Sequence, residues 1–91
     1  MLLEVITPEK LLFKGEVAHV QMPGIDGSFG VLKGHAPLVS ALKAGVVSVQ
    51  QADGEKEGEY ADTKANSEHF DFDVKGGVVE VYENKIIILA E

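Results

Sequence analysis

The chain has 91 residues, which is the length of one domain with a single hydrophobic core. It contains no cysteine, which excludes disulfides, thiolate metal sites and a thiol nucleophile. The formal net charge is −7 and arginine is absent, so the chain lacks the clustered basic side chains that bind nucleic acid or anionic lipid. No apolar run approaches the roughly 20 residues of a membrane-spanning helix.

Apolar and polar residues alternate along most of the chain, which is typical of strands with one face in water. In chain order the alternating runs are residues 3–6, 17–22, 46–50, 70–75 and 79–82. Residues 86–89 are apolar throughout and therefore predict a strand that is covered on both faces. Residues 7–11 carry helix-start signals, but this stretch is too short to make a stable helix.

Glycine, proline and asparagine recur between these runs, and turns about 8–12 residues apart are typical of antiparallel sandwiches. The pair Gly76-Gly77 lies between two alternating runs and predicts a hairpin there. We therefore expect an all-β fold: an antiparallel β-sandwich of about ten short strands, flattened and barrel-like. A single domain covers residues 1–91.

Acidic residues are concentrated in one window of the chain. Between Gln50 and Asp73 there are eight acidic residues and two lysines, so this window carries −6 of the net charge. Its part between residues 51 and 68 is poor in apolar side chains, with Tyr60 as the one aromatic residue. Such a segment buries little apolar surface. We expect a long, mobile, acidic hairpin excursion at about 51–68.

Three histidines raise the possibility of a zinc site. His19, His35 and His69 are separated by 16 and 34 residues, which matches no metal-ligand spacing. We interpret them as unrelated residues and predict no metal site.

Nucleotide binding and catalysis find no support in the motifs. Gly24, Gly27 and Gly30 are not followed by the Lys-Ser/Thr of a phosphate loop, and their interpretation is tight turns between strands. Asp71 and Asp73 fall on one wet face of a strand and are interpreted as solubilising. No serine has the flanking sequence of a nucleophile. We predict no catalytic residue and no cofactor.

Several motifs, taken in order, resemble one known family. Residues 5–17, with Thr7-Pro8-Glu9 after an apolar run, are similar to the opening of the epsilon subunit of F-type ATP synthases. Residues 23–38, which end in Gly34-His35-Ala36-Pro37-Leu38, resemble its most recognisable motif. Residues 42–47, 76–81 and 86–90 resemble its later turn and closing hairpin. The resemblance covers about three quarters of the chain.

The resemblance implies a non-catalytic rotor subunit in the central stalk. Such a subunit couples rotation of the membrane c-ring to the gamma subunit during ATP synthesis driven by an ion gradient. It also implies a peripheral location on the cytoplasmic face of the bacterial inner membrane, and a monomer when the chain is isolated. The candidate contacts are Asp26, Ser28 and His35 for the polar loops of the c-ring, and Val39, Leu42 and Val81 for gamma.

The chain departs from the family pattern in three places. An acidic residue is usual where Ser28 stands, and the excursion at 51–68 is about ten residues longer than the family's hairpin. Full-length relatives continue with two C-terminal helices that restrain ATP hydrolysis and in some members bind ATP. This chain stops at Glu91, either because it is trimmed or because the natural subunit is short. We expect the naturally short form, and in both cases we expect that the chain cannot inhibit hydrolysis by helix insertion.

Two other classes of function stay open at this point. One is a free-standing β-sandwich that binds a small ligand or a metal through its loops. Carbohydrate-binding sandwiches usually present tryptophan and tyrosine, whereas this chain has no tryptophan and two tyrosines, Tyr60 and Tyr82. The other is a small hydrolase, for which no nucleophile, base and oxyanion donor can be assembled.

Overall fold

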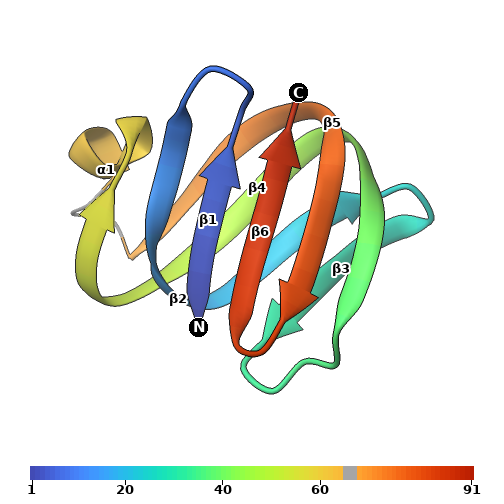
Figure 1. The fold of residues 1–91 in the computed structure, drawn as a ribbon, viewed down its shortest axis with the longest axis horizontal. Coiled ribbons are helices and arrows are strands. Elements are labelled where there is room, and N and C mark those ends of the chain that lie inside the picture. Colours follow the sequence, from blue (N-terminus) through green and yellow to red (C-terminus); the bar gives the residue numbers. More distant parts are fainter. Residues whose placement is uncertain (65–67) are drawn as a thin grey trace.

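The computed structural model describes residues 1–64 and 68–91. These residues form six strands and one short helix (Figure 1). In chain order they are β1 (Leu2–Ile6), β2 (Leu11–Gly24), β3 (Gly27–Leu32), β4 (Leu38–Glu57), α1 (Glu59–Lys64), β5 (His69–Tyr82) and β6 (Lys85–Ala90). The predicted all-β class is confirmed. The expected strand number of about ten is wrong because β2, β4 and β5 are long, with 14, 20 and 14 residues.

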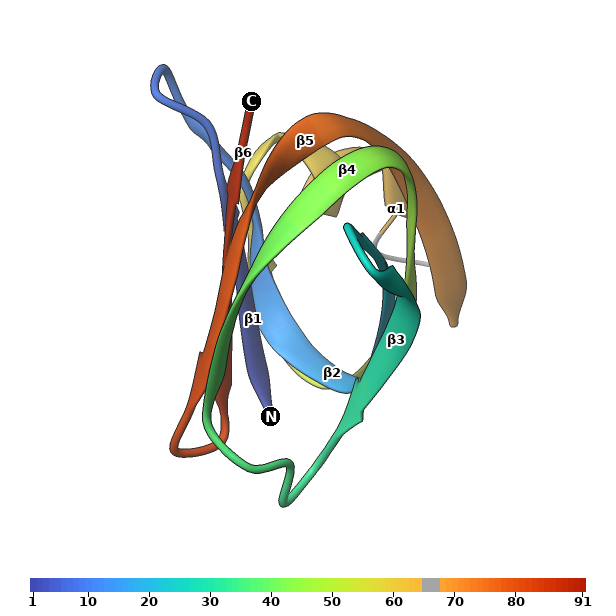
Figure 2. The ribbon, with the colours of Figure 1, turned by 90° about the vertical axis from the view of Figure 1, so that its right-hand side faces the viewer.

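Five of the strands close into a flattened barrel. The sheet order is β1-β6-β5-β4-β2-β3, and an additional pairing of β1 with β2 completes the ring. β3 pairs with β2 outside the ring, and β1 runs parallel to β6 while the other pairs are antiparallel. Figure 2 shows β1 and β6 in one layer and β3 in the other, with β4 and β5 arching between them.

The Gly76-Gly77 pair lies inside β5 and does not form the predicted hairpin. β5 continues through it and stays paired with β4 on both sides, as Val74 with Gly45 and Val78 with Ala41. Gly76 and Gly77 have φ values of 149° and 147°, which L side chains rarely adopt. A Cβ on Gly77 would also collide with the Leu89 carbonyl oxygen. The glycines therefore bend the strand from one layer to the other. The hairpin between β5 and β6 turns instead at Glu83 and Asn84, both with positive φ.

The core is filled by the inward side chains of both layers. Every second residue of β1 is buried, and the same alternation in β5 changes phase at Gly77. The largest fully buried side chains are Phe13, Leu3, Met22, Ile86 and Ile88. β6 follows the same alternation, because Ile86 and Ile88 are buried while Leu89 is 53% exposed. The prediction that residues 86–89 are covered on both faces is therefore wrong for this chain alone.

The described part of the acidic segment is strand and helix. β4 extends to Glu57 and pairs with the start of β2, and α1 then packs against β2. Gln51 and Ala61 are buried, and the Tyr60 ring lies 5.4 Å from the Phe72 ring, centroid to centroid. The expectation that this stretch buries little apolar surface is wrong at Tyr60 and Ala61, because Tyr60 packs against the core and Ala61 is buried. Residues 65–67 of the predicted excursion lie outside the described residues.

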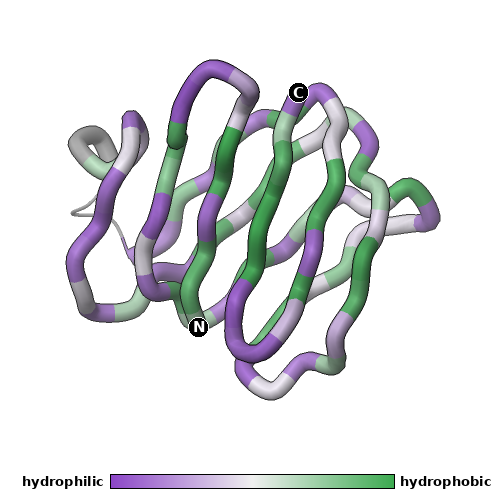
Figure 3. Tube along the Cα trace, in the orientation of Figure 1, coloured by the Kyte–Doolittle hydropathy of each residue, from purple (hydrophilic) through white to green (hydrophobic). Residues whose placement is uncertain are grey.

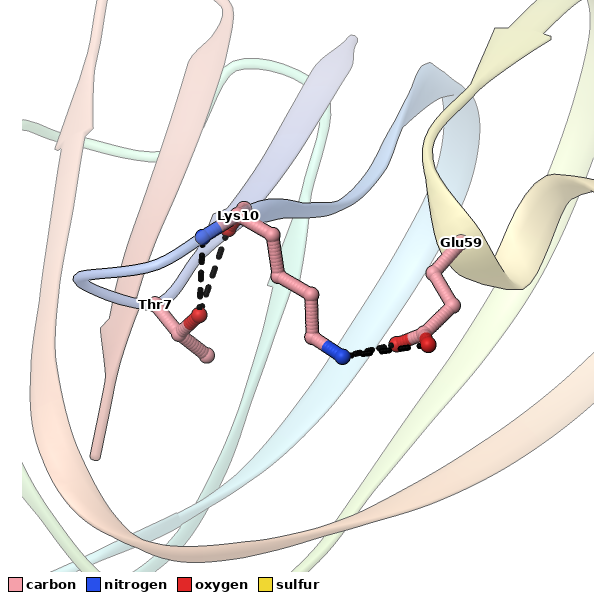
Figure 4. A network of polar contacts seen from close by, with 3 residues as sticks. All are labelled: Thr7, Lys10 and Glu59. Atoms are coloured by element: carbon pink, nitrogen blue, oxygen red, sulfur yellow. Dashed lines mark hydrogen bonds and ion pairs between the residues drawn. The ribbon is translucent and has the colours of Figure 1, made fainter.

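The turn between β1 and β2 makes an exposed ion pair with α1. Residues 7–11 do not form a helix; the Lys10 backbone N–H donates to Thr7 Oγ1 at 3.2 Å, and the Thr7 N–H donates to the Lys10 carbonyl at 2.9 Å. The Lys10 side chain then reaches Glu59 at the start of α1, with Nζ 2.9 Å from Oε2 (Figure 4). The hydrogen bond and the charge of Glu59 raise the pKa of Lys10 above its ordinary value of 10.5.

We expect Gly77→Ala to lower the free energy of unfolding by about 2 kcal/mol or more, since it combines a strained backbone with a collision against β6. Gly27→Ala is the matched control: Gly27 has φ 131° but an added Cβ would meet nothing within 4 Å. In Gly27→Ala we expect the free energy of unfolding to fall by about 1 kcal/mol, from backbone strain alone. Urea unfolding measures both values. Equal losses in the two variants would contradict the role of Gly77 at the bend.

We expect Glu59→Gln to return the pKa of Lys10 toward 10.5, as measured by NMR titration of the lysine side chain. The raised folded-state pKa means that the pair's contribution to stability is complete below pH 10.5 and is lost as the pH rises through the folded-state pKa. Glu9→Gln is the control, because Glu9 is a minor cause of the same shift. An unchanged pKa in Glu59→Gln would contradict this pairing.

Candidate functional site

The outward side chains of four adjacent strands form one surface, which we name the β6 face. It comprises Val39 and Ala41 of β4, Val78, Glu80 and Tyr82 of β5, Ile87 and Leu89 of β6, and Glu4 and Ile6 of β1. Cross-strand partners share a face of a sheet, so the strand register places these residues in rows. One row runs Val39, Glu80, Ile87 and Glu4, and the next runs Ala41, Val78, Leu89 and Ile6.

The β6 face is apolar and open to solvent. Val39 is 72% exposed, Val78 is 41% exposed, and Leu89 is half exposed as described above. The chain trace is hydrophobic along most of β6, although only alternate side chains of this strand point inward (Figure 3). A contiguous exposed apolar surface on a small protein is typical of a protein interface.

The charges on this face are unevenly paired. The Glu4 carboxylate is mostly buried and lies 3.2 Å from Lys85 Nζ and 3.8 Å from Lys14 Nζ. Within residues 1–64 and 68–91 none of the ion pairs involves Glu80. At the β1 edge of the face, the charge of Glu4 is therefore neutralised by two lysines, whereas the exposed carboxylate of Glu80 lies near the centre of the face.

The predicted gamma contacts divide between this surface and the core. Val39 is at the exposed edge of the β6 face, as expected for a contact residue. Leu42 and Val81 are 4% and 3% exposed and belong to the core. These two predictions are corrected, because the side chains of a strand alternate between faces and these two point inward. Val78, Glu80 and Tyr82 take their place on the surface.

The predicted ring contacts lie along β3, the strand paired on one side only. Asp26 is in the turn before β3, Ser28 is near its start, and His35 is in the loop after it. The Gln21 amide donates to Ser28 Oγ at 2.7 Å, and His35 Nδ1 lies 2.6 Å from the Ala36 carbonyl oxygen. All three residues are exposed. Because six strand residues span about 20 Å, Asp26 and His35 mark opposite ends of a line and do not form a cluster.

Shallow hollows, open to solvent, flank the β6 face. One of about 260 Å³ is lined by Pro37, Leu38, Val39, Glu80, Val81 and Tyr82. A second of about 380 Å³, lined by Phe29, His35, Leu38, Val39 and Ser40, connects the face to the β3–β4 loop. A third of about 430 Å³ lies beside β1 and is lined by Ile6, Thr7, Pro8, Leu89 and Ala90. Such hollows suit side chains of a partner surface.

The three histidines are not brought together. His19 and His69 occupy one row on either side of Gln50, two strand spacings or about 10 Å apart, and His35 is in the β3–β4 loop. Within the described residues no group of three histidine, aspartate or glutamate side chains is placed to hold a metal ion.

The glycines of residues 24–30 serve packing more than turn geometry. Of Gly24, Gly27 and Gly30, Gly27 alone has positive φ. A Cβ on Gly24 would come within 2.7 Å of the Gly27 carbonyl oxygen, and one on Gly30 within 2.7 Å of the Gln21 and His19 side chains. The interpretation as turn glycines is thus corrected for two of the three, which permit close approach within the β2–β3 hairpin.

Most residues of the β6 face were not predicted from the sequence. Its signal was present, because Val79 and Val81 alternate with Val78, Glu80 and Tyr82, which places the last three on one face. Periodicity alone does not say which of the two faces is inside.

Solved structures share the fold. The central stalk/c-ring structure of the Tetrahymena thermophila mitochondrial ATP synthase matches 99% of this chain and 62% of the matched chain, with a TM-score of 0.75 and 18% identity. The OSCP/F1/c-ring structure of the Euglena gracilis enzyme matches 97% of this chain and 48% of the matched chain, with a TM-score of 0.73 and 23% identity. At these identities the likeness establishes a common fold.

Sequence comparison gives the family. The ATP synthase epsilon chains of Chlorobium limicola and Chlorobaculum tepidum are 42% and 44% identical over 89 residues, which cover 98% of this chain and 86% of each relative. The epsilon chain of Campylobacter fetus is 40% identical, and the match covers 59% of its length. The family model described as ATP synthase, Delta/Epsilon chain, beta-sandwich domain matches residues 1–91. The chain therefore belongs to the ATP synthase delta/epsilon family and comprises its β-sandwich domain.

Proposed function

We propose that this chain is a non-catalytic central-stalk subunit of an F-type ATP synthase, which couples c-ring rotation to the gamma subunit during ATP synthesis driven by an ion gradient. The observation that carries the proposal is the exposed apolar β6 face on a domain whose relatives are epsilon chains. A part that transmits torque must deform little, and a closed barrel with a packed core meets this requirement.

The gamma subunit is the partner that we propose for the β6 face. Val39, Val78 and Leu89 form an apolar surface on strands that are fixed by neighbours on both sides. An interface needs this combination of apolar area and rigid support, because little ordering entropy is then lost on binding.

The c-ring is the partner that we propose for β3 and the loop that follows it. Ser28 on the edge of β3 and His35 in the following loop are exposed, and polar side chains here suit the polar loops of the ring. Asp26 lies in the turn before β3, at the end of the strand opposite to His35. With Ser28 in place of an acidic residue, we propose that Asp26 supplies the charge of this contact and that His35 supplies a polar side chain.

This arrangement fits a peripheral subunit on the cytoplasmic face of a bacterial inner membrane. No helix of the described residues is long and apolar enough to cross a membrane. Attachment through gamma and the ring is what we propose holds the chain there, and we expect a monomer when it is isolated.

Substituting Val39→Asp should reduce co-purification with gamma by about tenfold or more, because it places a charge in the apolar contact. Val46→Asp is the matched control: Val46 is an exposed valine of the same strand, 48% accessible, on the other side of the barrel. Retained gamma is quantified after affinity purification at low and moderate salt. Equal retention of both variants, or no retention of gamma by the unmodified chain, would refute the proposed docking.

Because the chain has no cysteine, single cysteines report contacts without background. We expect Ser28→Cys and His35→Cys to form disulfides with cysteines placed in the polar loop of the c-subunit of the assembled enzyme. Glu55→Cys, on an exposed residue of the β4 extension, should not. Mass spectrometry identifies the cross-linked products. Cross-links from Glu55→Cys but not from Ser28→Cys or His35→Cys would exclude the β3 edge as the ring contact.

A further inference from the structure

Glu80 has an exposed carboxylate with apolar neighbours. In the strand register its neighbours on the β6 face are Val39 of β4 and Ile87 of β6. Lys14 of β2 and Lys85 of β6, at the margin of this face, pair with Glu4 of β1, and β6 lies between Glu4 and Glu80. Glu80 itself is exposed and is hydrated in the free chain. Water therefore stabilises this charge until a partner covers the face.

Covering the face changes the energetics of Glu80. An apolar partner surface that displaced its water would leave a charged group without a counter-charge, which is strongly unfavourable. The same carboxylate stabilises a complex if the partner supplies a cation at that point. The face therefore selects for a partner that is apolar over Val78 and Leu89 and basic over Glu80.

The hollow beside Glu80 has the shape and lining for such a group. Its volume is about 260 Å³, its walls include Pro37 and Val39, and Tyr82 lies on the same side of β5 as Glu80. An arginine or lysine can lay its aliphatic stem against Pro37 and Val39 and direct its charge to the carboxylate. The Tyr82 ring, 56% exposed, offers a cation–π contact at the rim.

We propose that the hollow formed by Pro37, Val39, Glu80 and Tyr82 is an anchor site for one arginine or lysine side chain of the docking partner. The proposal rests on the proposed function, in which this partner is the gamma subunit. It adds the chemistry of recognition: the apolar area supplies affinity, and the single carboxylate fixes the register of the two proteins.

The test measures binding of the isolated gamma subunit to the full chain by calorimetry at two salt concentrations. We expect Glu80→Gln to weaken binding about tenfold and to flatten its salt dependence, and Glu80→Lys to weaken it further. Glu55→Gln is the matched control, since it removes the same charge from an exposed residue of the β4 extension and should leave binding unchanged. Thermal unfolding of each variant verifies that the fold is intact.

The possible outcomes separate the two proposals. If Leu89→Asp abolishes binding while Glu80→Gln binds as well as the unmodified chain or better, the anchor site is excluded and the docking face stands. If Glu80→Gln and Glu55→Gln weaken binding equally, the effect is one of net charge and the anchor site is again excluded. If gamma does not bind the unmodified chain, both proposals are overturned.

Discussion

The pairing of β4 with β5 is the constraint on which the rest of the structure depends. It runs through both layers of the barrel, from Leu38 opposite Val81 to Gln50 opposite His69. Both strands arch between the layers, and glycines lie side by side in this region, with Gly45 of β4 opposite Val74 and Gly76-Gly77 of β5 opposite Lys43 and Leu42 (Figure 2). A Cβ on Gly45 would lie 2.8 Å from Pro23, so the glycine permits β4 and β2 to pack closely at this point. The faces proposed for gamma and for the ring take their relative orientation from these bends.

Much of this fold could be predicted from alternation in the sequence. Alternating valine and charged residues in β5 identify a strand and its wet residues, and Asp71 and Asp73 are exposed as predicted. Alternation does not separate a glycine pair that turns the chain back from one that only bends it, because both need positive φ. The hairpin expected at residues 76–77 was wrong for this reason, and with it the strand number.

Alternation in the sequence also does not tell which of the candidate contact residues are exposed. His35, Ser28 and Asp26 are exposed as a partner contact requires, whereas Leu42 and Val81 are inside. A hydrophobic residue on a strand is suited equally to a core and to an interface, and only the register with neighbouring strands decides between them. For the same reason, the sequence did not predict that Leu89, which belongs to an unbroken apolar run, faces outward. The sequence did not predict the helix α1, because Tyr60 packs its ring at a tilt against Phe72, a contact between residues 12 positions apart.

The parallel pairing of β1 with β6 brings the first and last strands of the described chain side by side. Leu3 and Val5 can complete their ladder only after residues 85–90 have been synthesised. Because β1 pairs with β2 on its other edge, one edge of β1 stays unpaired until β6 is present, and the barrel cannot close before then. Long-range contacts of this kind slow folding, and they expose β1 to mispairing with other chains in the interval.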